Sequence, residues 1–193
     1  MKTNKISIIV AVIFAVVGLN AKAQECGIYK TYDDYTNGKM DVSIDCANKD
    51  GKIKPNDYFG KDYITVIKAG SKTDIKKDEI FGYQLCNGEF YRFLNNDRLT
   101  LADKSSLWIY TKEEKVSYSP FTGTKTVTKY YFSEEGHKEI KSLTFNNLKE
   151  ALPDNKVLYS EMELLFSSNS ALHAYNQSSG SFKINSFLNS KGL

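Results

Sequence analysis

The side chains that could carry chemistry are few and scattered along this sequence. Only two histidines occur, His137 and His173, and neither stands in an H-E-x-x-H or H-x-H arrangement that would bring two imidazoles to one metal ion. The nucleophile elbow G-x-S-x-G and the phosphate-binding motifs G-x-x-x-x-G-K-[ST] and G-x-G-x-x-G are absent from the sequence. The sequence therefore predicts no catalytic residue, no metal ligand set and no cofactor.

Neighbouring carboxylates recur but do not suggest acid–base catalysis. They include the pairs Asp33-Asp34, Glu113-Glu114 and Glu134-Glu135. Adjacent side chains point in different directions in a strand or a helix, so these pairs are expected to be solvated surface. The alternative that stays open is a hydrolase that assembles His137 or His173 beside a Glu or Cys from a distant part of the chain.

Residues 46–57 partly match a calcium-binding loop. Asp50 and Gly51 occupy positions that the loop requires, but Cys46 replaces the first acidic ligand and Asp57 replaces the long glutamate that closes the cage. With so few strong carboxylates the segment is better interpreted as an Asp-Gly turn between strands.

Three cysteines, Cys26, Cys46 and Cys86, have spacings of 20 and 40 residues that match no zinc, haem or thioredoxin motif. Two states remain open in an oxidising compartment. One has a single bridge, for which we consider Cys46 with Cys86, and one free thiol. The other has three reduced, buried thiols.

Tyrosine is abundant, with 13 residues that all follow position 23. Tyr32 and Tyr35 lie three residues apart, so a helix would place them on one face, with Tyr29 near its start. A tyrosine ring can stack on a partner while its hydroxyl forms a hydrogen bond, and this makes the three residues candidates for partner binding. The alternative is that the rings fix the N-terminal helix to a sheet.

The N-terminus has the tripartite pattern of a secretory signal peptide. Lys2 and Lys5 precede the apolar stretch Ile6–Leu19, and Ala21-Lys22-Ala23 supplies small residues before Gln24. We therefore expect residues 1–23 to be removed and the protein to be periplasmic or secreted.

Removal of residues 1–23 changes the charge balance. Lys2, Lys5 and Lys22 are three of the 26 basic residues, and no acidic residue lies in the segment, so 23 basic and 23 acidic side chains remain. A neutral chain gives no reason to expect binding to nucleic acid or anionic lipid. No membrane span is expected after cleavage.

The remaining chain predicts strands first and helices last. Alternating or β-branched residues predict strands at 40–46 and 62–69, a tight hairpin at Asn87-Gly88, a long hairpin of 107–118 with 124–133, and a strand at 138–143. In the first hairpin a two-residue loop pairs Leu85 with Phe90, Tyr83 with Arg92 and Gly82 with Phe93. Helices are expected at 27–38, 145–152, 156–166, 170–176 and 181–189. Thr31 can cap the first of these helices, with Asp34 at the third helical position, and Thr144 can cap the second.

This order predicts one α+β domain over residues 24–193. Its antiparallel β core, a sandwich- or barrel-like meander, covers residues 40–143, and helices follow over residues 144–190. The side chains expected to be mostly buried are Ile67, Leu85, Phe90, Phe93, Trp108, Ile109, Phe132, Leu148, Met162 and Leu165.

Several segments resemble a family of small exported Bacteroidetes proteins of unknown function. The likeness spans most of residues 27–188 and rests on Gly27–Tyr35, Phe59–Ile64, Ile80–Tyr83, Glu89–Phe93, Leu143–Leu148 and Leu152–Asn155. It implies a cell-envelope or secreted protein and carries over no catalytic residue. The resulting expectation is a non-catalytic binding module with a tyrosine-rich surface, whose partner is an envelope protein or glycan.

Overall fold

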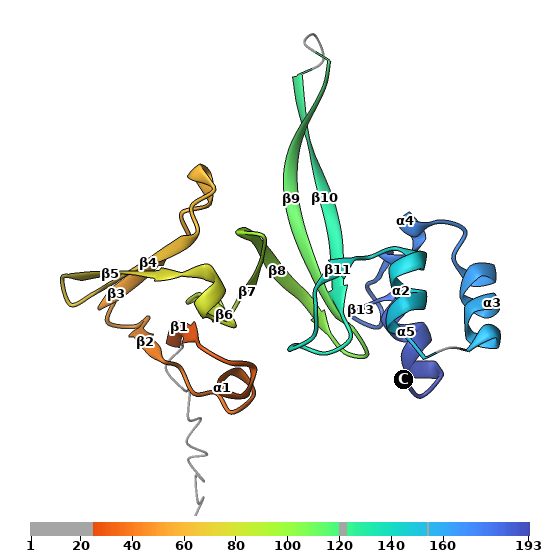
Figure 1. Cartoon of the computed structure of the whole chain (residues 1–193), viewed down its shortest axis with the longest axis horizontal. Helices are drawn as coiled ribbons and strands as arrows, with labels where there is room; N and C mark the ends of the chain where they lie inside the picture. Colours follow the sequence, from red (N-terminus) through yellow and green to blue (C-terminus); the bar gives the residue numbers. More distant parts are fainter. Residues whose placement is uncertain (1–24, 120–122, 154) are drawn as a thin grey trace, which may run out of the picture.

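The computed structural model describes residues 25–119, 123–153 and 155–193. The predicted signal peptide and residues 120–122 lie outside these described residues. Figure 1 shows antiparallel strands through the middle of the molecule, a smaller sheet to one side and helices at the C-terminal end. This arrangement confirms the α+β class with an antiparallel β core.

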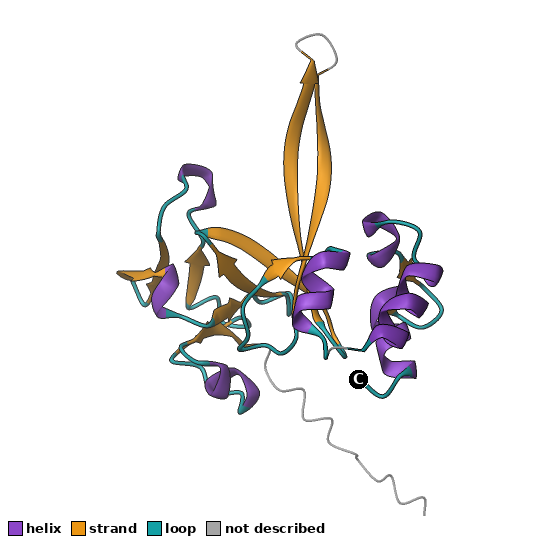
Figure 2. Cartoon of the chain, turned by 45° about the vertical axis from the view of Figure 1, so that its right-hand side comes forward, coloured by secondary structure: helices purple, strands orange, loops and turns teal. Residues whose placement is uncertain are grey.

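In the described residues the larger sheet has eight strands, in the order β11-β10-β9-β8-β7-β6-β1-β2. Strands β6 to β11 follow one another as a meander. The first strand of the chain, β1, lies between β6 and β2. The hairpin of β9 and β10 projects well beyond the other strands (Figure 2). The strand bounds are β1 Glu25–Tyr29, β2 Val42–Asp45, β6 Gly82–Gln84, β7 Phe90–Leu94, β8 Asp97–Lys104, β9 Trp108–Ser119, β10 Gly123–Ser133 and β11 Lys141–Ser142.

The smaller sheet packs against the β2, β1, β6 and β7 part of the larger one. It contains β3 (Gly51–Lys54), β4 (Tyr63–Lys68) and β5 (Ser71–Lys76). Ile64 on β4 lies in one buried cluster with Ile28 on β1, so the two sheets share a core as the layers of a sandwich do.

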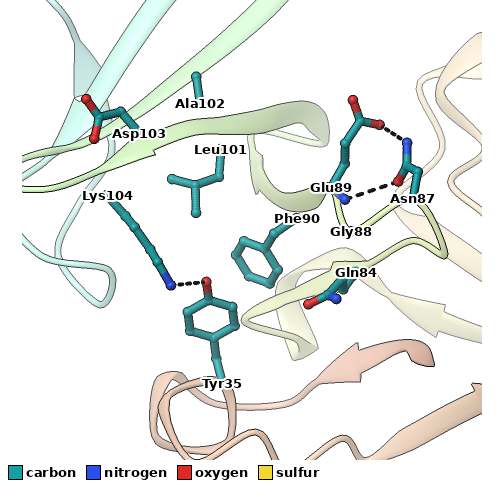
Figure 3. Close-up of a pocket in the computed structure, with 10 residues that line it drawn as sticks. All are labelled: Tyr35, Gln84, Asn87, Gly88, Glu89, Phe90, Leu101, Ala102, Asp103 and Lys104. Atoms are coloured by element: carbon teal, nitrogen blue, oxygen red, sulfur yellow. Dashed lines mark hydrogen bonds between the residues drawn. The ribbon is translucent and has the colours of Figure 1, made fainter. Parts of the chain in front are cut away.

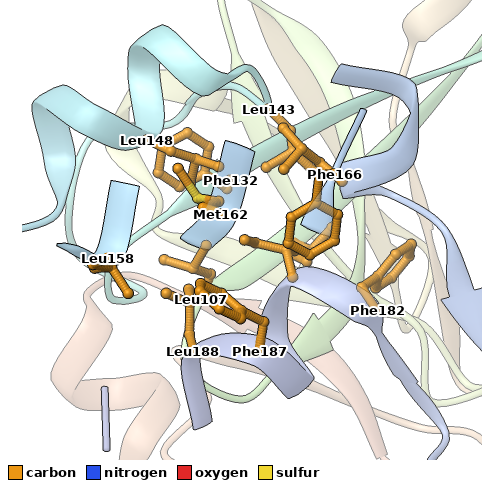
Figure 4. Close-up of a cluster of buried hydrophobic side chains, with 13 residues drawn as sticks. Leu107, Phe132, Leu143, Leu148, Leu158, Met162, Phe166, Phe182, Phe187 and Leu188 are labelled. Carbon is orange, nitrogen blue, oxygen red and sulfur yellow. The ribbon is translucent and has the colours of Figure 1, made fainter. Parts of the chain in front are cut away.

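The C-terminal helices cover the base of the long hairpin. They are α2 (Phe145–Ala151), α3 (Lys156–Leu165), α4 (Asn169–Leu172) and α5 (Lys183–Ser190), with the short strands β12 (Tyr175–Asn176) and β13 (Ser181–Phe182) before α5. Side chains from these helices meet side chains of the sheet in one apolar cluster (Figure 4). The fully buried members include Ile109, Phe132, Leu148, Met162 and Leu188.

Asn185 joins α5 to the sheet through its side-chain amide. Its Oδ1 accepts a hydrogen bond from Leu107 N at 2.9 Å, and its Nδ2 donates to Leu107 O at 3.0 Å. Both residues are buried, so the amide satisfies two backbone groups that would otherwise lack partners in the core.

The N-terminal segment differs from the helix expected at 27–38. Residues Glu25–Tyr29 form β1, and only Tyr32–Thr36 form a helix, α1. Pairing on both sides, with β2 and with β6, satisfies the backbone of β1 and buries it. Those distant partners could not be inferred from the local sequence.

The hairpin at Asn87-Gly88 exists, but the expected register is wrong by one residue. Tyr83 pairs with Tyr91, and Leu85 N donates to Glu89 O, so the loop has three residues rather than two. A type I′ turn needs positive φ at both central positions, and of Asn87 and Gly88 only Gly88 has it, at 85°.

Most of the side chains expected to be buried are buried or half-buried, but Leu165 on α3 is not. Leu165 is 62% exposed, and Phe166 is buried in its place. Leu158, Met162 and Phe166 are spaced by four residues and follow one helix face, which Leu165 leaves. Six of the expected side chains are buried, namely Phe90, Trp108, Ile109, Phe132, Leu148 and Met162, while Ile67, Leu85 and Phe93 are half-buried.

Shorter elements also differ from expectation. The strand expected at 138–143 is reduced to Lys141–Ser142, because Lys138 N bonds to Glu135 O in a turn. The two helices expected at 170–176 and 181–189 each share their residues with a two-residue strand.

Candidate functional site

Helix α1 is short but well capped, and it presents two tyrosines to the sheet. The Thr31 hydroxyl accepts a hydrogen bond from Asp34 N at 3.0 Å, and Asp34 Oδ2 accepts one from Thr31 N at 3.1 Å. This reciprocal capping box was expected from the sequence, and Gly38 follows the helix with a φ of 65°. The capping fixes the direction in which Tyr32 and Tyr35 leave the helix.

Tyr32 and Tyr35 belong to a cluster of aromatic rings. The ring centroid of Tyr35 lies 4.3 Å from that of Phe90 and 5.4 Å from that of Trp108. Tyr32 lies 5.5 Å from Phe81 and 6.0 Å from Trp108. The two tyrosines therefore share one face of α1, as their spacing predicted, and they fix the helix to the sheet.

Tyr29 has a different position from the other two tyrosines. It lies on β1, is only 5% exposed and packs edge-on against Tyr35 at 5.2 Å. Its ring supports the cluster from within the core, whereas Tyr32 and Tyr35 are half-buried and keep part of their surface in solvent. Tyr29 is therefore too buried to contact a partner, and Tyr32 and Tyr35 remain as the candidate partner-binding tyrosines.

Gly136 allows the rings of Tyr32 and Trp108 to pack closely against the backbone. A Cβ atom added to Gly136 would lie 2.5 Å from Tyr32 Cε2 and 2.7 Å from Trp108 Cη2. Real Cβ atoms do not approach other heavy atoms so closely, so any larger residue here would displace one of the two rings.

A hollow of about 540 Å³ opens beside Tyr35 (Figure 3). Its apolar part comes from Tyr35, Phe90 and Leu101, and polar side chains surround these residues. The polar or charged members come from β6, the following loop and β8, and they are Gln84, Asn87, Glu89, Asp103 and Lys104.

The carboxylates of this hollow are held by hydrogen bonds. Tyr91 Oη at 2.6 Å and Asn87 Nδ2 at 2.5 Å both donate to Glu89 Oε2, and these bonds lower the pKa of the Glu89 carboxyl. Asp103 accepts from Ser105 N at 3.1 Å. Glu89 is therefore ionised at neutral pH and suited to accept hydrogen bonds rather than to donate a proton.

Lys104 lies at the Tyr35 side of the hollow. Its Nζ is 5.6 Å from the centroid of the Tyr35 ring and 3.5 Å from the Tyr35 hydroxyl. The cation thus stays near the exposed part of Tyr35, where it adds a hydrogen-bond donor to an otherwise acidic rim.

Neither histidine has a nucleophile activated beside it among the described contacts. His137 Nδ1 lies 3.2 Å from Glu135 Oε2, and its ring packs on Tyr32 at 5.1 Å. Together with Thr31, Tyr32 and Asp33 it lines a shallow hollow of about 390 Å³. The Thr31 hydroxyl donates to Asp34 at 2.7 Å rather than to the imidazole.

His173 stacks on Tyr130, with ring centroids 3.9 Å apart and planes nearly parallel. Burial lowers the pKa of its imidazole, so the ring is neutral at physiological pH. A neutral stacked ring in this position completes the packing of α4 on the hairpin.

A second polar hollow of about 930 Å³ is lined by acidic and basic side chains, several of which form ion pairs. Lys112 Nζ lies 2.6 Å from Asp97 Oδ2 and 2.8 Å from Glu114 Oε1, and Arg98 Nε lies 2.9 Å from Asp57 Oδ2. A ligand would have to break these pairs to bind there, so the hollow beside Tyr35 is the better candidate.

Comparison with known proteins gives no information about function, so the function is inferred from the geometry of the site. No family model, curated protein or solved structure matches the chain. The resemblance to the exported Bacteroidetes family therefore stays a prediction. None of the helices in the described part of the chain is both long and apolar enough to cross a membrane.

The three cysteines and the calcium-like segment of residues 46–57 are the other candidates from the sequence. Cys46 and Cys86 form a disulfide, and Cys26 is a free, buried thiol. In the calcium-like segment Asp50 Oδ1 accepts a hydrogen bond from Asp45 N, and Gly51 begins β3, so the segment is a turn between strands.

The polar residues of the hollow could not be identified from the sequence. Gln84 and Lys104 are separated by 20 residues and come together only because β6 and β8 both pair with β7. No spacing signal marks such residues in the sequence, and the hairpin register needed to place them was wrong by one residue.

Proposed function

We propose that this protein is a non-catalytic, exported binding module of the cell envelope. Its ligand docks in the hollow beside Tyr35 and is a sugar unit of an envelope glycan or a polar loop of an envelope protein. The observation that carries the proposal is the combination of a half-exposed aromatic ring with amide and carboxylate side chains around one hollow.

The chemistry of the lining fits a polar ligand with one apolar face. The ring of Tyr35 offers a flat surface for stacking, and its hydroxyl lies within reach of Lys104. Gln84 offers both a donor and acceptors, while the ionised Glu89 only accepts. A sugar ring presents C–H groups on one face and hydroxyl groups at its edge, so it would use both kinds of surface.

We expect Gln84→Ala to weaken binding by roughly tenfold, the equivalent of one hydrogen bond of about 1.4 kcal/mol. Gln84 is half-buried and its side chain accepts one long hydrogen bond, from the Tyr29 hydroxyl at 3.5 Å, so the melting temperature should change little. Binding is measured on an array of bacterial envelope glycans and by recovery of partners from envelope fractions. Gln177→Ala, at an exposed turn far along the chain, is the matched control and should bind as the wild type does.

The double variant Tyr32→Ala, Tyr35→Ala tests whether these two rings contribute to both binding and packing. Because both rings contact Trp108, we expect this double variant to lose binding and also to melt several degrees lower. Tyr35→Phe keeps the ring and should keep the melting temperature. If Gln84→Ala and Tyr35→Phe both bind every ligand as the wild type does, the hollow is not the binding site.

The second candidate, an exported hydrolase, would place its chemistry at Glu135 and His137. His137 lines the shallow hollow next to Tyr32, and its Nδ1 lies 3.2 Å from Glu135 Oε2, which is the observation in favour of this candidate. A panel of nitrophenyl esters and glycosides tests it. Hydrolysis by the wild type that disappears in His137→Ala would replace the binding proposal.

Export is tested separately from binding. The protein recovered from the periplasm or medium of a Gram-negative host should have the intact mass of a chain that begins at Gln24. A recovered species that still contains Ile6–Leu19 would show that the segment is not a cleaved signal.

A further inference from the structure

Three sulfur atoms meet near one end of β1. The Sγ atoms of Cys26, Cys46 and Cys86 all lie within 4.8 Å of one another. Cys46 and Cys86 are joined as a disulfide, with Cα atoms 5.6 Å apart, and Cys26 has the free thiol. Thiol–disulfide exchange proceeds by attack of a thiolate on a nearby disulfide sulfur, so all the groups that the reaction needs are present.

The strand register holds these sulfur atoms together. β1 lies between β2 and β6, and the disulfide joins the ends of the two flanking strands. Cys26 pairs with Ile44, two residues before Cys46, and Gly27 pairs with Gln84, two residues before Cys86. Backbone pairing on both sides thus keeps Cys26 beside the bridge.

The three cysteines differ in their exposure to solvent. Cys26 is 2% exposed, Cys46 is half-buried and Cys86 is exposed. A thiolate that leaves a disulfide is a charge, and it is more stable in water than in the core. Cys46 packs against the same apolar cluster as Cys26, so attack on Cys46 with departure of Cys86 is the favoured direction.

We propose that Cys26 exchanges with the Cys46–Cys86 disulfide and thereby moves the free thiol from the core to the surface at Cys86. The Cys26 thiol gives its proton to solvent, and the thiolate attacks Cys46 Sγ. The Cys46–Cys86 bond breaks as the Cys26–Cys46 bond forms, and the released Cys86 thiolate takes up a proton. One disulfide and one thiol are present before and after, so no oxidant or reductant is consumed.

The product is a nucleophile at the edge of the hollow described above. Cys86 directly precedes Asn87 and Gly88, which line that hollow. There the thiol would react with soft electrophiles and with disulfides, forming a mixed disulfide with a thiol-containing partner. Burial first, and the charge of Asp50 next, raise the pKa of the Cys26 thiol, so the attacking thiolate is scarce and the exchange is slow.

Alkylation of the folded protein tests the proposal. The wild-type chain is incubated with N-ethylmaleimide under native conditions, then unfolded, treated with iodoacetamide and digested without reduction for mass spectrometry. We expect maleimide on Cys86 together with a Cys26–Cys46 disulfide. Maleimide on Cys26 beside an intact Cys46–Cys86 bridge, or no maleimide at all under native conditions, would overturn the proposal.

Cys26→Ala is the matched control, because it removes the attacking thiol and leaves the bridge. Its Cys86 should take up no maleimide. Labelled Cys86 in this variant would mean that the bridge opens without Cys26, which also contradicts the exchange. If the variant does not fold, the mapped bridge of the wild type decides the question alone.

Discussion

Replacing both Cys46 and Cys86 with alanine should lower the free energy of unfolding by about 2–4 kcal/mol. The bridge closes a loop of 40 residues, and a loop of that length restricts the unfolded chain by about 4 kcal/mol in the chain-entropy account. The same bridge links the loop after β2 to the loop after β6, next to the cluster that both sheets share. Denaturant unfolding followed by circular dichroism measures the loss.

The control for this prediction separates the cross-link from the loss of buried sulfur. Cys26→Ala removes a thiol that is 2% exposed and leaves the bridge, so it should cost less than the double variant. Addition of a reducing dithiol to the wild type should approach the stability of the double variant. If the double variant were as stable as the wild type, strand pairing and packing alone would hold β2 and β6 beside β1, and the bridge would be dispensable.

The sequence predicted elements well where the signal is local. The capping box of Thr31 and Asp34, the long hairpin of β9 and β10, and α2 after its cap Thr144 all follow from side chains within a few residues of each other. The hydrogen bonds that define each of these elements form within the element or with its neighbour in the sequence. A short window of sequence therefore contains the information needed to place it.

Elements that depend on distant partners were missed. The sequence predicts a helix over residues 27–38, where β1 forms instead, because the pairing of β1 with β2 and β6 is not visible locally. It predicts a buried Leu165, whereas Phe166 is buried, because only the position of the sheet decides which face of α3 is covered. The candidate site likewise contains residues that a local signal identifies and residues that only the strand pairing brings together. Tyr32 and Tyr35 could be found from their spacing, whereas Gln84, Glu89 and Lys104 required the register of three strands.

Leu148→Ala should be among the most destabilising single changes in the C-terminal half, with a loss of about 2–5 kcal/mol in the free energy of unfolding. Leu148 is fully buried on α2 and belongs to the cluster that also contains Ile109 and Phe132 of the long hairpin. Truncation removes apolar contacts and leaves a cavity that helix and sheet, fixed by their own backbone hydrogen bonds, cannot close. The loss is measured by denaturant unfolding.

Leu164→Ala is the matched control for this prediction. Leu164 has the same side chain, also lies on a helix of the C-terminal region and is 87% exposed, so its truncation should change stability by no more than about 0.5 kcal/mol. The difference between the two leucines then reports burial alone, since the substitution itself is identical. A loss below about 0.5 kcal/mol for Leu148→Ala as well would mean that the helices lie on the sheet without sharing its core, because only a shared core makes a cavity costly.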